Sequence, residues 1–254
     1  MLTNRNSMLK KERQAFIIKE INLHNKVLSS DLSMALDVSE DTIRRDLNEL
    51  AMEGRVVKVH GGALSKSYQM AAVQADTYAY EKKEVIAMKT LKLFKDGMVI
   101  LTSGGTTMRE IAKRLPESLQ VTFFTISPLI ALELAEHPKA DVILLGGQLS
   151  NASKVTIGAE VVQKISEIKA DICILGINGM DLDGITDSDY EIVQVKKAMI
   201  KASKQMIIPT ISEKLNTALR YKVTPTADID CLITELSPLH DTIQPYLSQV
   251  KLVL

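Results

Sequence analysis

The most constraining feature of this sequence is an alternation of short apolar runs with longer amphipathic segments over residues 98–236. The apolar runs are MVILTS, VTFFTI, DVILLGG, DICILGI, QMIIPT and CLITEL, and segments with helical periodicity such as TMREIAKRL and AEVVQKISEI lie between them. Continuous apolar strands that are bounded by glycine and alternate with helices are typical of a parallel sheet covered on both faces. We therefore predict a C-terminal α/β domain with a mostly parallel, doubly covered sheet.

The N-terminal part of the chain has a different pattern, which predicts three helices. Apolar positions repeat with helical spacing over residues 11–22. A second helix is expected to begin with Ser30 as its cap and to end near Val38. A third helix is expected to begin with Ser39 as its cap and to stop near Gly54, which suits a left-handed terminal residue.

A short hairpin follows the third predicted helix. The segment VVKVH, residues 56–60, alternates like a strand before two glycines turn the chain. Three helices and a small hairpin occur in this order in a winged helix-turn-helix domain. We place this DNA-binding domain at residues 1–65, a linker without clear periodicity at residues 66–80, and an α/β effector-binding domain at residues 81–254.

The third predicted helix carries the sequence SEDTIRRDLNEL. At 100° per residue its apolar side chains share one face, and Arg45 points to the opposite side. The structural alternative is a solvated face on which Asp41 pairs with Arg45. In a winged helix-turn-helix this helix lies in the major groove, where an arginine can bond guanine O6 and N7.

Two kinds of DNA contact are expected from this domain. Side chains on the outer face of the third helix are expected to meet base edges, and basic groups on its flank and on the hairpin are expected to meet phosphates. A tilt of the helix would exchange the roles of its two arginines. The candidate base contacts are Thr42, Arg45 and Asn48, and the candidate phosphate contacts are Arg44, Lys58 and His60.

The segment SEDTIRRDLNELAMEGRVVKVHGGA resembles the DNA-binding signature of the DeoR family of bacterial transcriptional regulators. The match includes the IRRDL core of the recognition helix and the HGGA that closes the wing. The resemblance continues into the second domain. It implies an effector domain similar in fold to ribose-5-phosphate isomerase and glucosamine-6-phosphate deaminase, which senses a phosphorylated sugar.

A glycine-rich turn in LTSGGTTMREIA follows the first predicted strand of the α/β domain. Glycines let backbone N–H groups approach an anion, hydroxyls add donors, and the start of a helix favours negative charge. The alternative is an ordinary strand-to-helix turn with a threonine cap. A Walker sequence is excluded, because no lysine follows the glycines at the required spacing.

Two further turns, at residues 125–127 and 144–147, end strands that we expect at the same edge of the sheet. Close backbone packing is the alternative explanation for the two glycines of LLGG. These turns and the glycine-rich turn predict a phosphate site. Its candidate residues are Ser103, Gly104, Gly105, Thr106, Thr107, Ser127, Gly146 and Gly147.

The segment GMDLDGITDSDYEIVQVKKAM concentrates acidic residues before two lysines. Ser188 and Glu191 fit a capping box, and Asp189 and Lys196 are spaced to share one helix face. A structural role and joint binding of a polar ligand are equally compatible with this pair. The DeoR resemblance implies that the motifs in this segment and in PTISEKL contribute to the effector site. These candidates are Asp187, Asp189, Glu191, Lys196 and Lys214.

Some positions depart from the motifs of the DeoR family. The first effector loop has Thr102 where the family commonly has an acid, and Gly105 replaces a threonine. Ile126 replaces an asparagine, and Ile211 stands at the expected position of an aspartate. These departures are compatible with phosphate binding and leave the identity of the sugar open.

Composition limits the remaining possibilities. Lysine plus arginine and aspartate plus glutamate each total 31, and the first 70 residues carry a net charge of +2 against −2 for the rest. One copy is therefore expected to bind DNA weakly, and we predict a homo-oligomer, either dimer or tetramer, on spaced half-sites. Two cysteines in apolar runs indicate buried thiols in a reducing compartment. We expect a cytoplasmic protein without a membrane segment, metal site or cofactor.

Three classes of function are compatible with parts of this pattern. The first is a transcriptional regulator, in our interpretation a repressor of carbohydrate metabolism genes, that binds a double-stranded operator and a phosphorylated sugar. The second is a sugar-phosphate isomerase or deaminase with a DNA-binding appendage, which would need a general base that none of the four histidines is well placed to supply. The third, a pure oligomerisation module, leaves the hydroxyl-rich glycine turn without an explanation. We favour the regulator.

Overall fold

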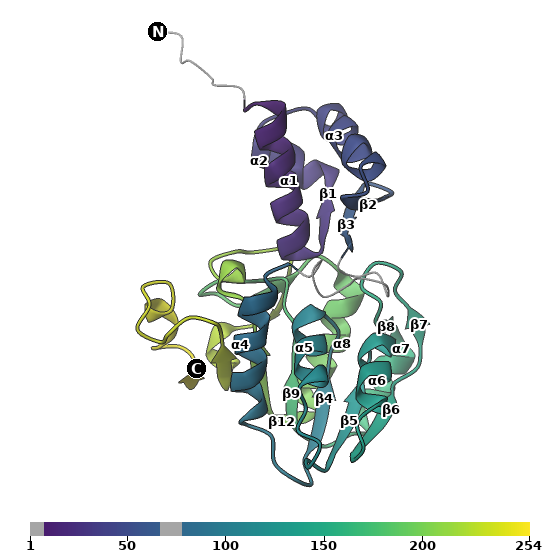
Figure 1. The fold of residues 1–254 in the computed structure, drawn as a ribbon, viewed down its shortest axis with the longest axis vertical. Helices are drawn as coiled ribbons and strands as arrows, with labels where there is room; N and C mark the ends of the chain where they lie inside the picture. Colours follow the sequence, from purple (N-terminus) through teal and green to yellow (C-terminus); the bar gives the residue numbers. More distant parts are fainter. Residues whose placement is uncertain (1–7, 67–77) are drawn as a thin grey trace. The chain divides into compact units, whose positions relative to one another are not determined.

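The computed structural model describes residues 8–66 and 78–254 (Figure 1). The chain folds into two compact units, Met1–Ala72 and Val73–Leu254, which we call the N-terminal and C-terminal units. The linker predicted at residues 66–80 falls mostly on residues 67–77, which lie outside the described residues.

Three helices and a small antiparallel sheet form the described part of the N-terminal unit, as predicted. The strands lie in the order β1-β3-β2, with the β2–β3 hairpin as the wing. The elements are α1 (Lys10–His24), β1 (Lys26–Leu28), α2 (Ser29–Leu36), α3 (Glu40–Met52), β2 (Val56–Val59) and β3 (Gly62–Ser65). The short strand β1 was not predicted, because three residues are too few to show a period.

The ends of α3 follow the sequence signals. The Ser39 hydroxyl accepts the Thr42 N–H at 3.2 Å, and Gly54 takes φ +68° just beyond the helix. The predicted Ser30 cap is wrong, because Ser30 lies inside α2. There the chain passes directly from β1 into the helix, and the Ser29 N–H bonds the Gly61 carbonyl at 2.8 Å.

The two wing glycines have different roles: Gly61 makes the turn, and Gly62 allows β3 to approach β1 closely. Gly61 turns the chain with φ +74°, whereas Gly62 already belongs to β3. A Cβ on Gly62 would lie 1.9 Å from the Val27 carbonyl oxygen of β1. A side chain at this position would therefore push β1 off the sheet.

The C-terminal unit contains the predicted parallel sheet. Within residues 78–254 it has seven strands in the order β15-β14-β12-β9-β4-β5-β6, and every neighbouring pair is parallel. The sheet strands are β4 (Val99–Thr102), β5 (Val121–Thr125), β6 (Ala140–Leu144), β9 (Ala170–Ile174), β12 (Ser203–Pro209), β14 (Cys231–Ile233) and β15 (Leu252–Val253).

Helices cover both faces of this sheet. Helices α4, α5 and α6 pack side by side, and α7 packs against α8 (Figure 1). Their bounds are α4 (Tyr80–Leu91), α5 (Thr106–Lys113), α6 (Pro128–Ala135), α7 (Ala159–Ser166) and α8 (Tyr190–Lys201).

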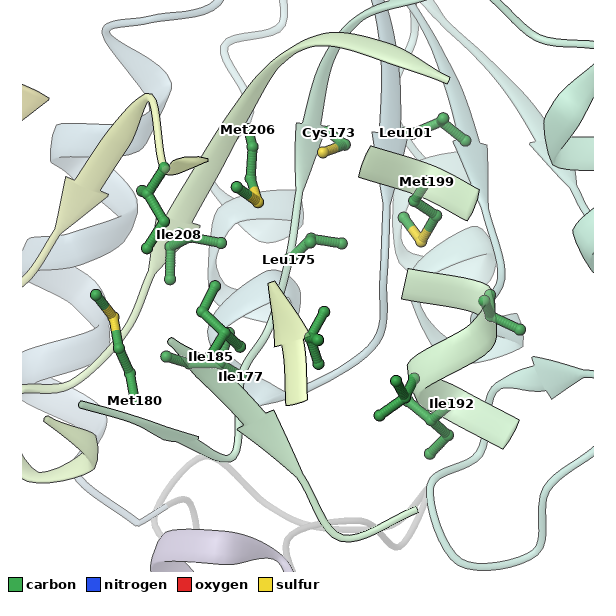
Figure 2. Packing of buried hydrophobic residues seen from close by; sticks show 14 of the residues in the cluster. Leu101, Cys173, Leu175, Ile177, Met180, Ile185, Ile192, Met199, Met206 and Ile208 are labelled. Carbon is green, nitrogen blue, oxygen red and sulfur yellow. The ribbon is translucent and has the colours of Figure 1, made fainter. Parts of the chain in front are cut away.

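Side chains alternate between the two layers, as they must on a doubly covered sheet. Leu101 and Cys173 pack with Met199 of α8 in one buried cluster (Figure 2), while Ile174 lines a small apolar space with Met108 and Ile111 of α5 on the other face.

Smaller elements complete the unit and carry part of the candidate site. Strands β10, β11 and β13 form an antiparallel sheet, and β7 pairs with β8. Short 3₁₀ helices lie in the loops around the last strands. The bounds are β7 (Gln148–Leu149), β8 (Thr156–Ile157), β10 (Gly179–Met180), β11 (Ile185–Asp187), η3 (Ser212–Lys214), β13 (Tyr221–Thr224), η4 (Thr226–Asp228) and η5 (Gln244–Tyr246).

Candidate nucleic-acid interface and effector site

The two arginines of α3 lie in different surroundings. Arg44 pairs with Glu40 and Asp41 at 3.4 and 3.3 Å, and its side chain is 59% exposed. The Asp41–Arg45 pair considered from the sequence is not formed. Arg45 is exposed and has no hydrogen-bond or ion-pair partner within residues 8–66 and 78–254. Arg45 is therefore the more available of the two for a base edge, and contact of Arg44 with a phosphate stays a prediction.

The other candidates of the N-terminal unit are also placed by the structure. Lys58 of the wing donates a hydrogen bond to Asn48 Oδ1, so the structure brings these two candidates together. The Thr42 hydroxyl lies 2.9 Å from the Ser39 hydroxyl and takes part in capping α3. His60 is exposed in the turn after β2. Asn48 and Lys58 thus join the outer face of α3 to the wing.

Asp46 has a structural role that its sequence context did not reveal. It is 2% exposed and accepts hydrogen bonds from Arg13 of α1, at 2.5 Å from Nε and 3.3 Å from Nη2. A buried bidentate pair of this kind fixes α1 against α3. The available signal was an acid beside the apolar positions of an amphipathic helix, where only a paired carboxylate is tolerated.

In the C-terminal unit the three predicted turns lie at adjacent strand ends. Strands β4, β5 and β6 are neighbours, with Thr102 opposite Thr125 and Thr125 opposite Leu144. A Cβ on Gly104 would lie 2.6 Å from Val155 Cγ1 and 3.4 Å from the Ser127 hydroxyl. The glycine-rich turn and the turn after β5 are therefore in contact.

The glycine-rich turn leads into α5 without a side-chain cap. The helix begins at Thr106, its N-cap is Gly105 with φ +118°, and the alternative of a threonine cap is not realised. The first-turn N–H groups of such a helix favour an anion. Thr107 is half-buried in the same turn. Ser103 is already engaged, because its hydroxyl accepts the Gly176 N–H at 2.8 Å.

The third turn favours the packing alternative. A Cβ on Gly147 would lie 2.3 Å from Val161 Cγ2 of α7. The Gly146 carbonyl accepts a hydrogen bond from Lys164 at 3.2 Å. Close approach to α7 therefore accounts for glycine at position 147 without a ligand.

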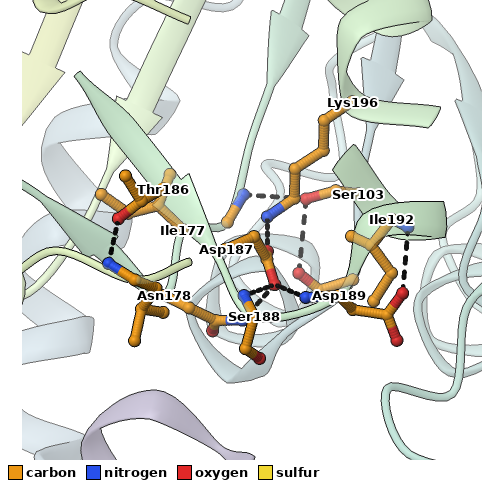
Figure 3. Close-up of polar contacts among 12 residues, drawn as sticks. Ser103, Ile177, Asn178, Thr186, Asp187, Ser188, Asp189, Ile192 and Lys196 are labelled. Atoms are coloured by element: carbon orange, nitrogen blue, oxygen red, sulfur yellow. Dashed lines mark hydrogen bonds and ion pairs between the residues drawn. The ribbon is translucent and has the colours of Figure 1, made fainter. Parts of the chain in front are cut away.

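A buried ion pair lies close to the glycine-rich turn. Asp187 of β11 and Lys196 of α8 are 1% and 5% exposed, and their charged atoms are 2.7 Å apart, beside Ser103 (Figure 3). Burial acts to raise the pKa of Asp187, but the Lys196 ammonium and hydrogen bonds from Asn178 and the Asp189 N–H hold it below its usual value.

One expectation about this segment, the capping box, is wrong. The cap of α8 is Asp189, which accepts the N–H groups of Glu191 and Ile192 at 3.1 and 3.4 Å, so Ser188 and Glu191 do not form the capping box. Lys196 pairs with Asp187 and not with Asp189, and contact of Asp189 with a ligand stays a prediction. The predicted cap, Ser188, and the observed cap, Asp189, differ by one residue. A run of neighbouring acidic residues does not determine which position caps the helix. Glu191 is exposed.

Two further lysines near this pair lack a carboxylate partner. Lys214 donates to the Ile177 carbonyl at 2.6 Å, and burial together with the charges of Lys83 and Lys196 lowers its pKa to about 7. Lys83 of α4 is 5% exposed and donates to the Tyr78 carbonyl, and burial lowers its pKa to about 8. Within the described residues neither forms an ion pair.

Lys83 was not among the predicted site residues. It lies in YEKKEVIAMKTL, where a lysine on a helix with many lysines gives no sign of burial. Together, Lys83, Lys196 and Lys214 are three buried or half-buried ammonium groups, of which Lys196 is paired with Asp187. Glu110 and Glu213 are close enough to raise the pKa of Lys83, but neither forms an ion pair with it. A buried ammonium group without an ion-pair partner favours a small anion.

Two negative findings concern the described residues only. Residues 8–66 and 78–254 contain no group of three or more histidine, cysteine or acidic side chains that could hold a metal ion. No helix among them is long and apolar enough to cross a membrane.

Comparison with known families gives two matches. The family of the DeoR C terminal sensor domain matches residues 78–236. The DeoR-like helix-turn-helix domain matches residues 13–69. The two matches cover both units.

Curated relatives match along almost the whole chain. The HTH-type transcriptional regulator GolR of Listeria innocua is 32% identical, over 88% of this chain and 90% of its own. The HTH-type transcriptional repressor GlcR of Bacillus subtilis is 29% identical, over 91% and 90%. The glycerol-3-phosphate regulon repressor of Escherichia coli is 30% identical, over 91% and 93%.

Solved structures show weaker likeness. That of eIF2B beta from Chaetomium thermophilum covers 72% of this chain and 64% of its own, with a TM-score of 0.49 and 12% identity. Ribose 5 phosphate isomerase A from Neisseria gonorrhoeae covers 53% of both chains, with a TM-score of 0.39 and 15% identity. Neither likeness carries a conclusion about function.

Proposed function

This chain belongs to the DeoR family of transcriptional regulators, and from that premise we propose that it is a repressor of carbohydrate metabolism genes, released from its operator by a phosphorylated sugar or a related metabolite. The observation that carries the effector half of the proposal is the pair Lys83 and Lys214, two ammonium groups with lowered pKa that form no ion pair with any described residue. The names of relatives that repress the glycerol-3-phosphate regulon support a phosphate ester as the effector.

A phosphate group suits both parts of the proposed site, the first turn of α5 and the two lysines. A phosphate dianion would accept hydrogen bonds from the first turn of α5 and from the hydroxyls of Thr106 and Ser127. Lys83 and Lys214 would supply the charge-assisted bonds, while Lys196 stays paired with Asp187. Binding of the dianion would favour the protonated, charged form of both lysines, which burial disfavours.

The operator is bound, in this proposal, by α3 and the wing. Arg45, Thr42 and Asn48 meet base edges, and Arg44, Lys58 and His60 meet phosphates. The small net charge of the first 70 residues, +2, supports a homo-oligomer that places two copies on spaced half-sites.

The enzyme alternative is not favoured, because the matched families and relatives are regulators. An isomerase or deaminase needs a general base facing the sugar carbons. Asp187, the buried carboxylate of the site, is held ionised by Lys196 and by backbone N–H groups, so its proton affinity is low. This is the setting of a structural ion pair.

Fluorescence anisotropy of the full-length protein tests the proposal. The probe is DNA from upstream of its own gene, with scrambled DNA as competitor, and a panel of sugar phosphates and inorganic phosphate is added in turn. We expect specific binding that one phosphate ester weakens at least tenfold. Binding without sequence preference, together with turnover of a panel member, would replace the repressor by the enzyme.

A further inference from the structure

Tyr78, at the start of the described part of the C-terminal unit, makes contacts with Lys83 and with Glu213. Its backbone carbonyl accepts a hydrogen bond from the Lys83 ammonium, and its hydroxyl donates to Glu213 Oε2. The Lys83 ammonium also lies 5.8 Å from the centroid of the Tyr78 ring, a cation–π distance. We call these three contacts the Tyr78 anchor.

Both partners in the Tyr78 anchor are connected to the proposed effector site. Lys83 is one of its two unpaired lysines, and Glu213 directly precedes Lys214, the other, in η3. Within the described residues the Tyr78 carbonyl is the one hydrogen-bond acceptor of the Lys83 ammonium, which has three N–H donors. An anion is a stronger acceptor for an ammonium than a neutral carbonyl. A bound anion therefore pulls the ammonium toward itself, and the bond to the Tyr78 carbonyl, the weaker acceptor, is the contact that this movement lengthens.

The residue after Tyr78 is strained. Ala79 has φ +54° and ψ +41°, a left-handed conformation in which the Cβ of a non-glycine residue crowds the next carbonyl. Such a conformation persists where neighbouring contacts hold it. Ala79 lies between the Tyr78 anchor and the first turn of α4, where its own carbonyl accepts the Lys83 N–H at 3.1 Å.

We propose that the Tyr78 anchor couples the effector site to the part of the chain that precedes it. The anionic group of the effector draws the Lys83 ammonium from the Tyr78 carbonyl, and Ala79 then leaves its left-handed conformation. Occupancy of the site thereby changes the backbone at the position where the chain enters the described part of the C-terminal unit. This inference rests on the proposed function and adds the regulation of its site.

Hydrogen exchange of the full-length protein measures both halves of the inference, with inorganic phosphate as the probe. Amides of residues 103–107 report occupancy of the glycine-rich turn, and amides of residues 79–84 report release of the anchor. In the wild type we expect phosphate to slow exchange in the first region and to raise it at least threefold in the second.

Two variants and one control separate coupling from binding. Tyr78→Phe removes the bond to Glu213, so residues 79–84 should exchange faster without phosphate, and the operator Kd without any ligand should rise about fivefold. Ala79→Gly removes the strain, so phosphate should no longer raise exchange there. Tyr80→Phe loses a comparable bond, that from Arg114 Nη2 at 2.6 Å, and should behave as the wild type.

The outcomes distinguish this inference from the function on which it rests. Slower exchange at residues 103–107 without any change at 79–84 would overturn the coupling and leave the effector site in place. An operator Kd of Tyr78→Phe equal to that of Tyr80→Phe would also overturn the coupling and leave the effector site in place. Absence of any response to phosphate in both regions would remove the effector site itself, and the coupling with it.

Discussion

The two units of this protein hold their positive charges in opposite settings. On α3 of the N-terminal unit, Arg44 and Arg45 are exposed, and in the C-terminal unit Lys83 is 5% exposed with a pKa of about 8. Exposed arginines are hydrated and stay charged, which suits a polyanion that offers many phosphates at once. Buried lysines carry a desolvation cost that one well-placed anion relieves. The proposed function thus uses exposed charge for DNA and buried charge for a small anion.

The largest effect is expected where a buried charge loses its partner. Asp187→Asn leaves the Lys196 ammonium buried and uncompensated, so the free energy of unfolding should fall by about 3–5 kcal/mol. Urea denaturation measures this loss. The matched control is Asp189→Asn, which keeps a side-chain cap on α8 and should change stability by less than about 0.5 kcal/mol. Equal losses of stability in the two variants would mean that the ion pair with Lys196 does not account for the contribution of Asp187 to the free energy of unfolding.

Removal of the half-buried Lys214, which forms no ion pair with any described residue, should have the opposite consequence for stability. Lys214→Met should weaken binding of the effector by about 2–4 kcal/mol while leaving effector-free operator binding unchanged. Its free energy of unfolding should stay level or rise, because an uncompensated ammonium is replaced by an apolar chain. Lys197→Met, at an exposed position of α8, is the control. Calorimetry and thermal denaturation test both claims, and undiminished effector binding in Lys214→Met would place the anion elsewhere.

The exposed arginines should show smaller effects that differ in kind. Arg45→Ala should weaken operator binding by about 1–3 kcal/mol and relax the preference at one base pair. Arg44→Ala, whose guanidinium is shared with Glu40 and Asp41, should weaken operator and scrambled DNA alike. Anisotropy on both DNAs separates the two. An equal loss on both DNAs for Arg45→Ala would make it a phosphate contact.

The dependence of stability on pH should distinguish the units further. Lys214 has a pKa of about 7 in the folded protein, below its value in the unfolded chain, so the folded state binds fewer protons above pH 7. Stability should therefore rise between pH 7 and 9, by about 1 kcal/mol per pH unit from this group. Urea denaturation across this range measures the slope. Lys214→Met should lower the slope most between pH 7 and 8, because Lys83, with a pKa of about 8, still contributes above that pH. An unchanged slope in that variant would assign the titration to another residue.

Sequence patterns predicted the architecture well because periodicity determines it. The apolar runs became strands of one parallel sheet, and Ser39 and Gly54 delimit α3 as expected. What the sequence could not reveal was set by tertiary packing. Lys83 looks like any surface lysine of an amphipathic helix until α4 is placed, and the partner of Lys196 depends on how β11 pairs.

The effector site was therefore predicted only in part. The glycine-rich turn and Ser127 lie together as the strand order implied, whereas Gly147 packs against α7. In the acidic segment Asp187 forms the buried pair with Lys196, whereas Asp189 caps α8. Which of the candidate residues contact DNA or effector stays a prediction.

The most direct test of the buried-lysine site is the proton uptake that accompanies effector binding. Calorimetric titration at pH 8 in two buffers of different ionisation enthalpy measures it, with the sugar phosphate that releases the operator as ligand. Its phosphate is already a dianion at this pH, because the second pKa is about 6. We expect the protein to take up about one proton per bound ligand, since Lys83 and Lys214 are partly neutral there. Binding heats that are the same in both buffers would contradict the assignment of the effector anion to these two lysines.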